Sequence, residues 1–512
     1  MIYSAAFSLS LLLPTAHGTL LIAFFLLPLD NGCIVRKAKI LATLGPASRE
    51  PVLLEALLAA GVNGVRINMS HGTQDEHAES IARARAAAER MRRPLSVLVD
   101  LSGPKIRTGV LKGGQPVQLE ANSLFTITTR SVAGDAREVS TNYSGMARDV
   151  KPGARLLLDD GLIELHAERT TETDVVCRVI NGGPLGERKG INLPGIILPI
   201  PSLTDKDRRD LQWAVRQHAD YIALSFVRRA QDCVEAKSLI AAAGGRQPLV
   251  AKIEKAEAID HLDEIIAAAD GVMVARGDLG VETSVELVPV YQKRIIEQAV
   301  LANKFVITAT QMLQSMVTNP RPTRAEASDV ANAVWDGSDC VMLSNETAMG
   351  QNPVAAVATM ARIIETAETG RKTGSSVVEK WAGRQSGKFS RALCEAAASA
   401  AEELSIKTIA VFTESGLMAR RLSSLRPDQR IVALTNSRDV QNELALIWAA
   451  EPLVHLPCES TEQMVRTGER ALLEAGIVQP GEMIVLMAGM LSGLGLSRSV
   501  KLHEIGDAGA QQ

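Results

Sequence analysis

Residues 249–278 read LVAKIEKAEAIDHLDEIIAAADGVMVARGD, and this stretch contains two short apolar runs, Leu249–Ile253 and Gly271–Ala275. Each run has the length and the apolar character of a buried β-strand. The residues between them can form a helix, and charged residues stand at the end of each run. Strand–helix–strand units of this kind build parallel sheets.

Six further runs of the same kind lie on either side of this stretch, at 39–43, 64–68, 96–100, 221–225, 305–308 and 340–343. Helical patterns follow the strands, for example at 52–60, 75–91, 205–218 and 325–335. Eight alternating strands and helices predict an α/β fold with a closed (β/α)8 TIM barrel. An open, doubly wound sheet is the alternative.

The alternation is interrupted after the third strand and again after the eighth. Residues 105–198 contain Gly and Pro turns and short alternating runs, which predict an inserted all-β, β-barrel-like domain. A polar segment at 369–387 indicates a linker, and residues 388–512 predict a C-terminal α/β domain. The barrel then comprises residues 35–104 and 199–368. The runs that support the two added domains are 124–129, 155–158, 162–166, 391–404, 408–412, 431–434 and 483–487.

Composition excludes some classes of partner. The 512 residues are 46% hydrophobic and carry a net charge of -3, so we expect full cores and no general attraction to nucleic acid or to an acidic membrane. The six cysteines are widely spaced without a CxxC pair, which favours reduced thiols in a cytoplasmic protein. Residues 1–34 lack a clear signal sequence, so we expect a disordered extension or a start-site error, with Val35 as the true start.

Polar residues gather where the predicted strands end. In a TIM barrel the chemistry lies at the carboxyl ends of the strands. A polar or charged cluster follows nearly every predicted strand here, which loop solubility alone does not explain. These clusters are 66–72, 100–107, 225–228, 252–254, 275–278 and 308–311.

Lys252 and Glu254 stand two residues apart on one strand, so their side chains point to the same side. They could form a structural ion pair. Alternatively, Glu254 and Asp278 could hold a divalent cation, and Mg²⁺ suits two carboxylates with open positions for water or substrate. Phosphoryl transfer needs such cations and little covalent chemistry from the protein. Gly277 would let backbone N–H groups approach a phosphate or carboxylate closely.

Longer motifs surround these residues, and together they resemble the pyruvate kinase family. They are KILATLGPAS at 39–48, GVRINMSHG at 64–72, GPKIRTG at 103–109, KGINLP at 189–194, SFVR at 225–228, MVARGDLG at 273–280, ATQML at 309–313 and PRPTRAEASDVANA at 320–333. The resemblance implies a barrel, a lid domain inserted after strand three, and a C-terminal regulatory and oligomerisation domain. It also implies an allosteric, homotetrameric cytoplasmic enzyme of glycolysis that converts phosphoenolpyruvate and ADP into pyruvate and ATP.

The resemblance also implies roles for single residues. Glu254 and Asp278 are expected to bind Mg²⁺ or Mn²⁺, and Lys252 to stabilise the transferring phosphoryl group and the enolate. Thr310 is expected to relay a proton to the enolate. The expected substrate contacts are Arg66, Lys252, Gly277, Asp278 and Thr310, of which Arg66, Lys252 and Thr310 are catalytic. The expected nucleotide contacts are Asn68, Met69, Ser70, His71, Arg107 and the lid residue Lys189.

The sequence departs from the family at its potassium site. The resemblance places K⁺ at Asn68, Ser70, Asp100 and the position of Leu101. Many members have Thr where this chain has Leu101, and Glu where it has Lys105. A Lys105 ammonium would repel a neighbouring monovalent cation, so we predict that Lys105 replaces K⁺. A Lys105 side chain that points to solvent is the alternative.

The C-terminal domain holds the family's expected effector position. Residues 412–416 read FTESG between a strand and a helix, and backbone N–H groups there could hold a sugar phosphate or AMP. Glu414 would oppose this if it pointed inward, and the loop at 489–498 departs from the family pattern. Two other functions stay open, namely a catalytically silent barrel kept as a regulatory subunit, and a metal-dependent lyase or aldolase that acts on a pyruvate-like substrate.

Overall fold

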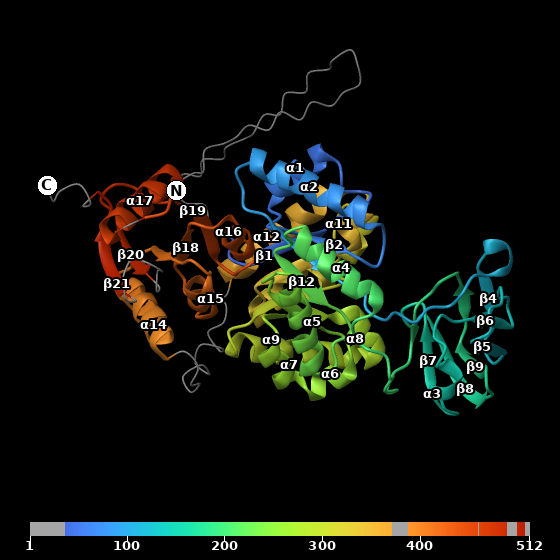
Figure 1. The fold of residues 1–512 in the computed structure, drawn as a ribbon. Coiled ribbons are helices and arrows are strands. Elements are labelled where there is room, and N and C mark those ends of the chain that lie inside the picture. Colours follow the sequence, from blue (N-terminus) through green and yellow to red (C-terminus); the bar gives the residue numbers. More distant parts are fainter. Residues whose placement is uncertain (1–35, 371–387, 459, 489–498, 507–512) are drawn as a thin grey trace, which may run out of the picture. The chain divides into compact units, whose positions relative to one another are not determined.

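The computed structural model describes residues 36–370, 388–458, 460–488 and 499–506, and residues from Arg36 onward form one compact unit. The expected extension at 1–34, most of the polar linker and the loop at 489–498 lie outside the described residues. Three strand-containing regions follow one another along this unit (Figure 1). They are a barrel, an inserted β domain and a C-terminal α/β domain, as the sequence predicts.

The first region is a closed barrel of eight parallel strands, in the order β1-β2-β3-β12-β13-β14-β15-β16 around the ring. The predicted barrel is therefore confirmed and the open sheet is excluded. Two strand ends differ by one residue from the prediction, since β12 ends at Leu224 and β15 continues to Ala309. The strands are β1 (Lys39–Thr43), β2 (Gly64–Asn68), β3 (Ser96–Asp100), β12 (Tyr221–Leu224), β13 (Leu249–Ile253), β14 (Gly271–Ala275), β15 (Phe305–Ala309) and β16 (Cys340–Leu343).

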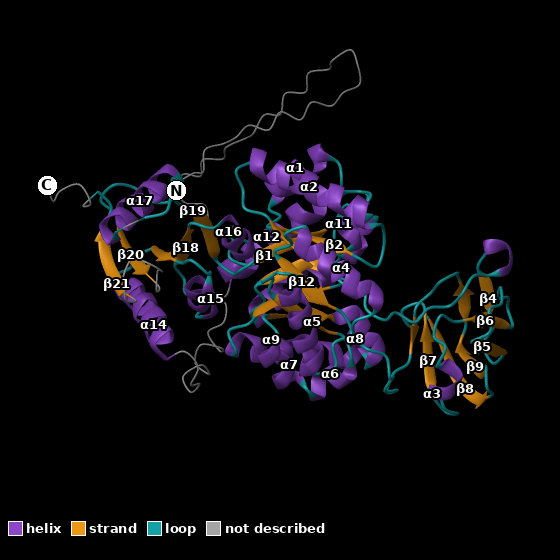
Figure 2. Ribbon diagram, viewed as in Figure 1, coloured by secondary structure: helices purple, strands orange, loops and turns teal. Residues whose placement is uncertain are grey.

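Helices cover the outside of this barrel, as Figure 2 shows. Most barrel strands are buried along their whole length, because one face meets the barrel interior and the other meets these helices. Capping boxes at Thr73, Thr204 and Thr323 fix where three of the helices begin. The helices are α1 (Pro51–Ala60), α2 (Gln74–Arg90), α4 (Asp205–Arg216), α5 (Ala230–Ala242), α6 (Ala256–Asp260), α7 (Leu262–Ala268), α8 (Arg276–Glu282), α9 (Val288–Leu301), α10 (Arg324–Asp336), α11 (Asn345–Ala348) and α12 (Pro353–Gly370).

The inserted domain contains a six-stranded sheet in the order β11-β7-β8-β9-β5-β6, with its own apolar core. Isolated bridges join Thr108 to Thr141, beside β6, and Arg107 to Gly190, beside β11. The segment at 107–108 thus connects the two edges of the sheet. Its elements are β4 (Val117–Leu119), β5 (Leu124–Thr128), β6 (Glu138–Ser140), α3 (Met146–Asp149), β7 (Arg155–Leu158), β8 (Ile163–Thr170), β9 (Asp174–Asn181), β10 (Gly183–Leu185) and β11 (Ile191–Asn192).

The C-terminal domain has a five-stranded sheet in the order β19-β18-β17-β20-β21. Both edge strands were absent from the sequence prediction. β19 (Ala450–Val454) contains Pro452, which disfavours a strand assignment, and β21 (Ser499–Glu504) is mostly polar and exposed. The other elements are α14 (Lys388–Glu403), β17 (Thr408–Phe412), α15 (Leu417–Ser424), β18 (Arg430–Thr435), α16 (Arg438–Leu444), α17 (Thr461–Glu474) and β20 (Met483–Ala488).

Buried polar contacts join this domain to the base of the barrel, where the strands begin. Arg426 donates to the Gly337 carbonyl and lies 3.2 Å from the Asp339 carboxylate. Lys39 Nζ donates to the Ala450 carbonyl at 2.8 Å. One continuous apolar cluster spans the barrel and the C-terminal domain. A substitution at the base of the barrel can therefore alter the packing of both domains.

Asp220, also at the base, carries a pH-dependent part of the stability. Its carboxylate accepts the Val97 N–H at 2.7 Å, and burial raises its pKa to about 7. The unfolded pKa is about 3.9, so stability is full below that pH and falls as pH rises toward the folded value. We expect the stability advantage of Asp220→Asn over the wild type to grow by about 2–3 kcal/mol between about pH 5 and about pH 8. Thermal or urea unfolding at both pH values measures this, and an advantage independent of pH would contradict it.

Candidate active site

The carboxyl ends of the barrel strands bring the predicted charged residues together. Lys252 lies on β13 with its ammonium 3.3 Å from Asp100 Oδ1 and 3.4 Å from Glu254 Oε2. It also donates to Ser225 Oγ at 2.6 Å. Arg66, on β2, donates through Nε and Nη2 to Asp100 Oδ2 at 2.8 and 2.5 Å. Two cations and two carboxylates therefore share one buried cluster, and it contains Lys252 and Glu254, the pair that the alternation along the strand predicted to point to one side.

The charges in this cluster hold one another ionised. Burial alone would lower the pKa of Lys252, but Asp100 and Glu254 outweigh it and raise that pKa. Burial would likewise raise the pKa of Asp100, yet Lys252 and Arg66 lower it. A cationic Lys252 is thus maintained at the barrel mouth, although the residue is only 8% exposed.

Glu254 has one satisfied and one unsatisfied oxygen. Oε1 accepts the Phe226 N–H at 2.6 Å, a contact made possible by the left-handed backbone of Phe226 (φ +58°). Oε2 is buried without a hydrogen-bond partner. Burial, opposed by Lys252 and reinforced by Asp278, raises the pKa of Glu254. A bound cation would supply the missing partner and lower this pKa.

Asp278 is the second carboxylate that could hold this cation. It lies in the first turn of α8 and is close enough for its charge to raise the pKa of Glu254. Within the described residues, no group of three or more His, Cys, Asp or Glu side chains could hold a metal ion. Two carboxylates alone fit Mg²⁺, which usually keeps several water or substrate oxygens as ligands.

Thr310 and Gly277 meet beside this carboxylate pair. The Gly277 N–H donates to Thr310 Oγ1 at 2.8 Å, and that hydroxyl donates to the Ala309 carbonyl at 2.6 Å. Thr310 has φ +68°, a costly conformation for a β-branched residue. Strain of this kind persists where surrounding contacts enforce it, which is common in active sites.

Arg276 enforces this conformation and was given no role from the sequence. Its guanidinium donates to the Thr310 carbonyl at 2.6 Å and to the Ala309 carbonyl at 3.2 Å. It also pairs with Asp329 of α10 at 2.6 Å. Arg276 lies in the polar cluster at 275–278, which indicated a place in the site. These partners are more than 30 residues away in the sequence, so the local pattern could not predict them.

Two further supporting residues were missed. Ser225 holds the Lys252 ammonium, and Asp207 of α4 accepts the Ser102 hydroxyl at 3.1 Å and the Gly103 N–H at 3.0 Å. Asp207 therefore fixes the loop that carries Lys105, while it also completes the cap at Thr204. The capping box of Thr204 and Asp207 does not predict the contacts of Asp207 with Ser102 and Gly103.

The predicted nucleotide loop follows β2 directly. Asn68 Oδ1 accepts the Ser70 N–H at 3.1 Å, and the Met69 carbonyl accepts from Lys206 Nζ at 2.7 Å. Burial, followed by the charges of Arg107, Lys105 and Arg66, lowers the pKa of His71. The loop and these cations therefore share one region of the barrel mouth.

Lys105 acts electrostatically on two groups of the site. Its charge lowers the pKa of His71 and opposes the raised pKa of Glu254. Leu101, at the expected potassium position, is buried and has no side-chain oxygen, although its carbonyl accepts the Ser225 hydroxyl at 2.7 Å. The first observation places the Lys105 charge close enough to act on the site, and the second shows that the expected potassium position has one side-chain oxygen fewer.

The structure does not place Lys189 with the other predicted nucleotide contacts after β2. Its ammonium pairs with Asp159 of the inserted domain at 2.9 Å. Arg107 donates to the neighbouring Arg188 carbonyl at 3.0 Å. A cleft of about 300 Å³ lies between the barrel mouth and the inserted domain, lined in part by Lys105, Asn192 and Asp278. The inserted domain therefore borders the site while its lysine faces its own carboxylate.

The fold and the residues at the carboxyl ends of its strands define a barrel enzyme. Its buried cations, and the carboxylates that could bind a metal ion, suit phosphoryl transfer. Comparison with known proteins agrees. Residues 35–357 match the family description "Pyruvate kinase, barrel domain", and residues 391–502 match "Pyruvate kinase, alpha/beta domain". The chain therefore belongs to the pyruvate kinase family, whose members transfer a phosphoryl group from phosphoenolpyruvate to ADP.

Individual relatives cover nearly the whole chain. Pyruvate kinase 2 of Synechocystis is 45% identical over 462 residues, which are 90% of this chain and 77% of that protein. Pyruvate kinase of Mycobacterium tuberculosis is 42% identical over 475 residues, 93% of this chain and 99% of that protein. The crystal structure of a pyruvate kinase from Cryptosporidium parvum has a TM-score of 0.85 at 34% identity, and it covers 92% of this chain and 96% of its own.

No helix in the described parts of the chain combines the length and apolar character needed to cross a membrane.

Proposed function

We propose that this chain is a Mg²⁺-dependent pyruvate kinase that works without K⁺, with its chemistry centred on Lys252, Glu254 and Asp278. The observation that carries the proposal is the buried cluster in which Lys252 contacts two carboxylates and Glu254 Oε2 accepts no hydrogen bond. The silent-barrel alternative predicts loss of these groups, and all of them are present.

The residues divide the reaction among them. The P–O bond of phosphoenolpyruvate breaks, a β-phosphate oxygen of ADP forms the new P–O bond, and the pyruvate enolate takes a proton at its methylene carbon. Lys252 and Arg66 place positive charge where the phosphoryl group and the enolate oxygen gather negative charge. Thr310 relays the proton, and the backbone N–H groups at Gly277 and Asp278 are the donors that would orient the carboxylate of the substrate.

Glu254 and Asp278 would hold the divalent cation, Mg²⁺ or Mn²⁺. When bound, it adds positive charge that helps neutralise the transferring phosphoryl group. Asn68, Met69, Ser70, His71 and Arg107 border the ADP position in this proposal. Lys189 joins them only after it leaves Asp159, so closure of the inserted domain exchanges one anionic partner for another. A closed domain also excludes water, which would otherwise compete as phosphoryl acceptor.

A coupled assay of pyruvate formation tests this function. We expect pyruvate only when phosphoenolpyruvate, ADP and Mg²⁺ are all present. A lyase or aldolase would release pyruvate from another substrate without ADP, and a silent barrel would release none. Either result would contradict the proposal.

The Lys105 proposal predicts a switch in cation use. Replacing K⁺ by Na⁺ or Tris should change wild-type turnover by less than about twofold, because the Lys105 charge is permanent. The Leu101→Thr/Lys105→Glu variant, which restores both family residues, should depend on K⁺ by on the order of tenfold or more. Lys112→Glu makes the same charge change on an exposed lysine of the inserted domain and serves as the control. A wild type that loses most activity without K⁺ would refute the proposal.

The remaining proposals rest on family membership. They are a homotetramer, a cytoplasmic location, and a sugar-phosphate or AMP effector at 412–416. The start of α15 at Gly416, without a side-chain cap, supports the effector position because uncapped N–H groups can meet a phosphate. Light scattering measures the tetramer directly.

A further inference from the structure

One buried carboxylate between the barrel and the inserted domain has no part in the proposed mechanism. Glu282 ends α8, and the residue is only 6% exposed. Its Oε1 accepts from Lys255 Nζ at 2.7 Å and from Asn192 Nδ2 at 2.8 Å. Lys255 lies in the barrel two residues after β13, whereas Asn192 ends β11 of the inserted domain. A single oxygen atom therefore contacts both parts of the protein.

The Lys255 side of this contact leads to the first of the two carboxylates proposed to hold the cation. Lys255 follows Glu254 in the sequence, and its ammonium lies 5.3 Å from the centre of the Phe226 ring. The backbone N–H of the same Phe226 donates to Glu254 Oε1 at 2.6 Å. Lys255 is thus fixed between Glu282 and the ring of the residue that holds Glu254. Movement of Glu282 would be transmitted to the backbone that carries Glu254.

Helix α8 leads to the second of these carboxylates. Asp278 and Glu282 stand four residues apart on α8, so their side chains lie on the same face of the helix. Both residues line the cleft of about 300 Å³ beside the barrel mouth, together with Asn192 and Lys255. Because α8 is one short hydrogen-bonded unit, a shift of Glu282 also moves Asp278.

The segment that returns from the inserted domain to the barrel is fixed near both of its ends. At the barrel end, Arg228 donates through Nη1 to the Leu198 carbonyl at 2.6 Å and through Nη2 to the Ile200 carbonyl. These contacts tie that end of the segment to the loop after β12. At the other end, the side chain of Asn192 contacts Glu282. The Asn192 contact therefore restrains the inserted domain at the point where it joins this segment.

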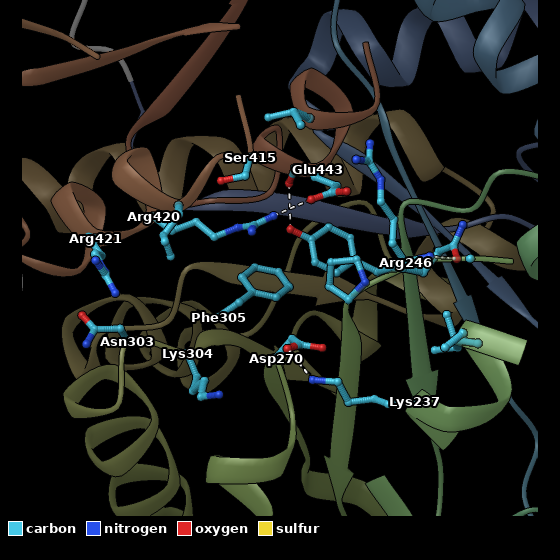
Figure 3. Close-up of a pocket in the computed structure, with 18 of the residues that line it drawn as sticks. Lys237, Arg246, Asp270, Asn303, Lys304, Phe305, Ser415, Arg420, Arg421 and Glu443 are labelled. Atoms are coloured by element: carbon cyan, nitrogen blue, oxygen red, sulfur yellow. Dashed lines mark hydrogen bonds and ion pairs between the residues drawn. The ribbon is translucent and has the colours of Figure 1, made fainter. Parts of the chain in front are cut away.

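The barrel is the fixed body against which the inserted domain can move. One apolar cluster runs from the barrel into the C-terminal domain, whereas the inserted domain has a separate core. At the barrel base, in the region drawn in Figure 3, the Tyr221 hydroxyl donates to the backbone carbonyl of Glu443 at 2.8 Å. The ion pair of Lys255 and Glu282 lies within the barrel and stays intact when the inserted domain moves. The hydrogen bond of Asn192 is the part of this network that can open.

We propose that Glu282 is a positioning residue that couples the inserted domain to the carboxylates of Glu254 and Asp278. The inference rests on the proposed function, in which these two carboxylates hold the divalent cation. The two carboxylates repel each other until a cation binds, so binding orders α8 and Lys255. An ordered Glu282 favours the contact with Asn192. That contact favours cation binding by the same factor, because coupling between two sites is reciprocal.

Hydrogen exchange followed by mass spectrometry, on the metal-depleted full chain without substrate, tests this coupling. Adding Mn²⁺ should slow exchange of the wild-type segment 190–198 by about fivefold. Asn192→Ala should abolish that slowing and weaken Mn²⁺ binding, measured by electron paramagnetic resonance, by about the same factor. This variant keeps the buried pair of Lys255 and Glu282, so it should fold. Glu282→Gln should keep most of the coupling, because its amide oxygen can still accept from both donors.

Asn181→Ala is the matched control, since Asn181 donates to Glu164 within the inserted domain, and it should keep both the slowing and the Mn²⁺ affinity. Two results would overturn the coupling alone. They are normal Mn²⁺ binding without any change of exchange at 190–198, and an Asn192→Ala protein that melts at a lower temperature but keeps the wild-type slowing and affinity. A wild-type protein that binds no Mn²⁺ would contradict the proposed function as well.

Discussion

Lys252→Met should lower kcat by on the order of 10³-fold, because the positive charge beside the transferring phosphoryl group is lost from a buried site. Methionine has a similar length, so the barrel should still fill its interior. Asp100 keeps its contact with Arg66, whereas Glu254 loses the nearby ammonium. We therefore expect a lower melting temperature together with a native circular dichroism spectrum. Steady-state assays and thermal unfolding measure both effects.

A control separates this loss from a general effect of removing a lysine. Lys293→Met removes an exposed lysine of α9 that pairs with Asp336. It should leave kcat within about twofold of the wild type, as surface changes usually do. Wild-type turnover in Lys252→Met would count against the assigned role.

Glu254→Gln should weaken the binding of divalent cation by on the order of 100-fold, because one of two anionic ligands becomes neutral. The amide can still accept the Phe226 N–H through its oxygen, so the local backbone should be retained. Titration with Mn²⁺, followed by electron paramagnetic resonance in the absence of substrate, measures the binding directly. The Mg²⁺ concentration at half-maximal activity should rise in parallel.

Glu451→Gln provides the matched control, since Glu451 is partly buried and pairs with Arg430 in the C-terminal domain. Its Mn²⁺ affinity should equal that of the wild type. Equal Mn²⁺ affinity in Glu254→Gln would show that the cation is held elsewhere.

Much of the fold could be predicted because its signals are local. Each barrel strand is a short apolar run, and the helices begin at capping residues such as Thr73. The edge strands β19 and β21 could not be predicted this way. Their pairing with β18 and β20 stabilises segments whose own composition is ambiguous.

In the candidate site, too, the contacts set by local pattern could be predicted and the contacts set by tertiary structure could not. Lys252 and Glu254 were predicted to point the same way because the period of a strand is two residues, and the structure confirms their contact. The hydrogen bond from Arg276 to the Thr310 carbonyl depends on tertiary structure. The pairing of Lys189 with Asp159 depends on the position of the whole inserted domain. No local pattern contains that information.

The central claim is that the cluster of Lys252, Glu254 and Asp278 moves a phosphoryl group from phosphoenolpyruvate to ADP. Phosphorus NMR of metal-depleted protein with both substrates, together with proton NMR of the same samples to follow pyruvate, before and after Mg²⁺ is added, tests it most directly. We predict no change before Mg²⁺ is added, and afterwards ATP and pyruvate formed in equal amounts. Pyruvate with inorganic phosphate in place of ATP, or turnover at full rate without Mg²⁺, would contradict the account.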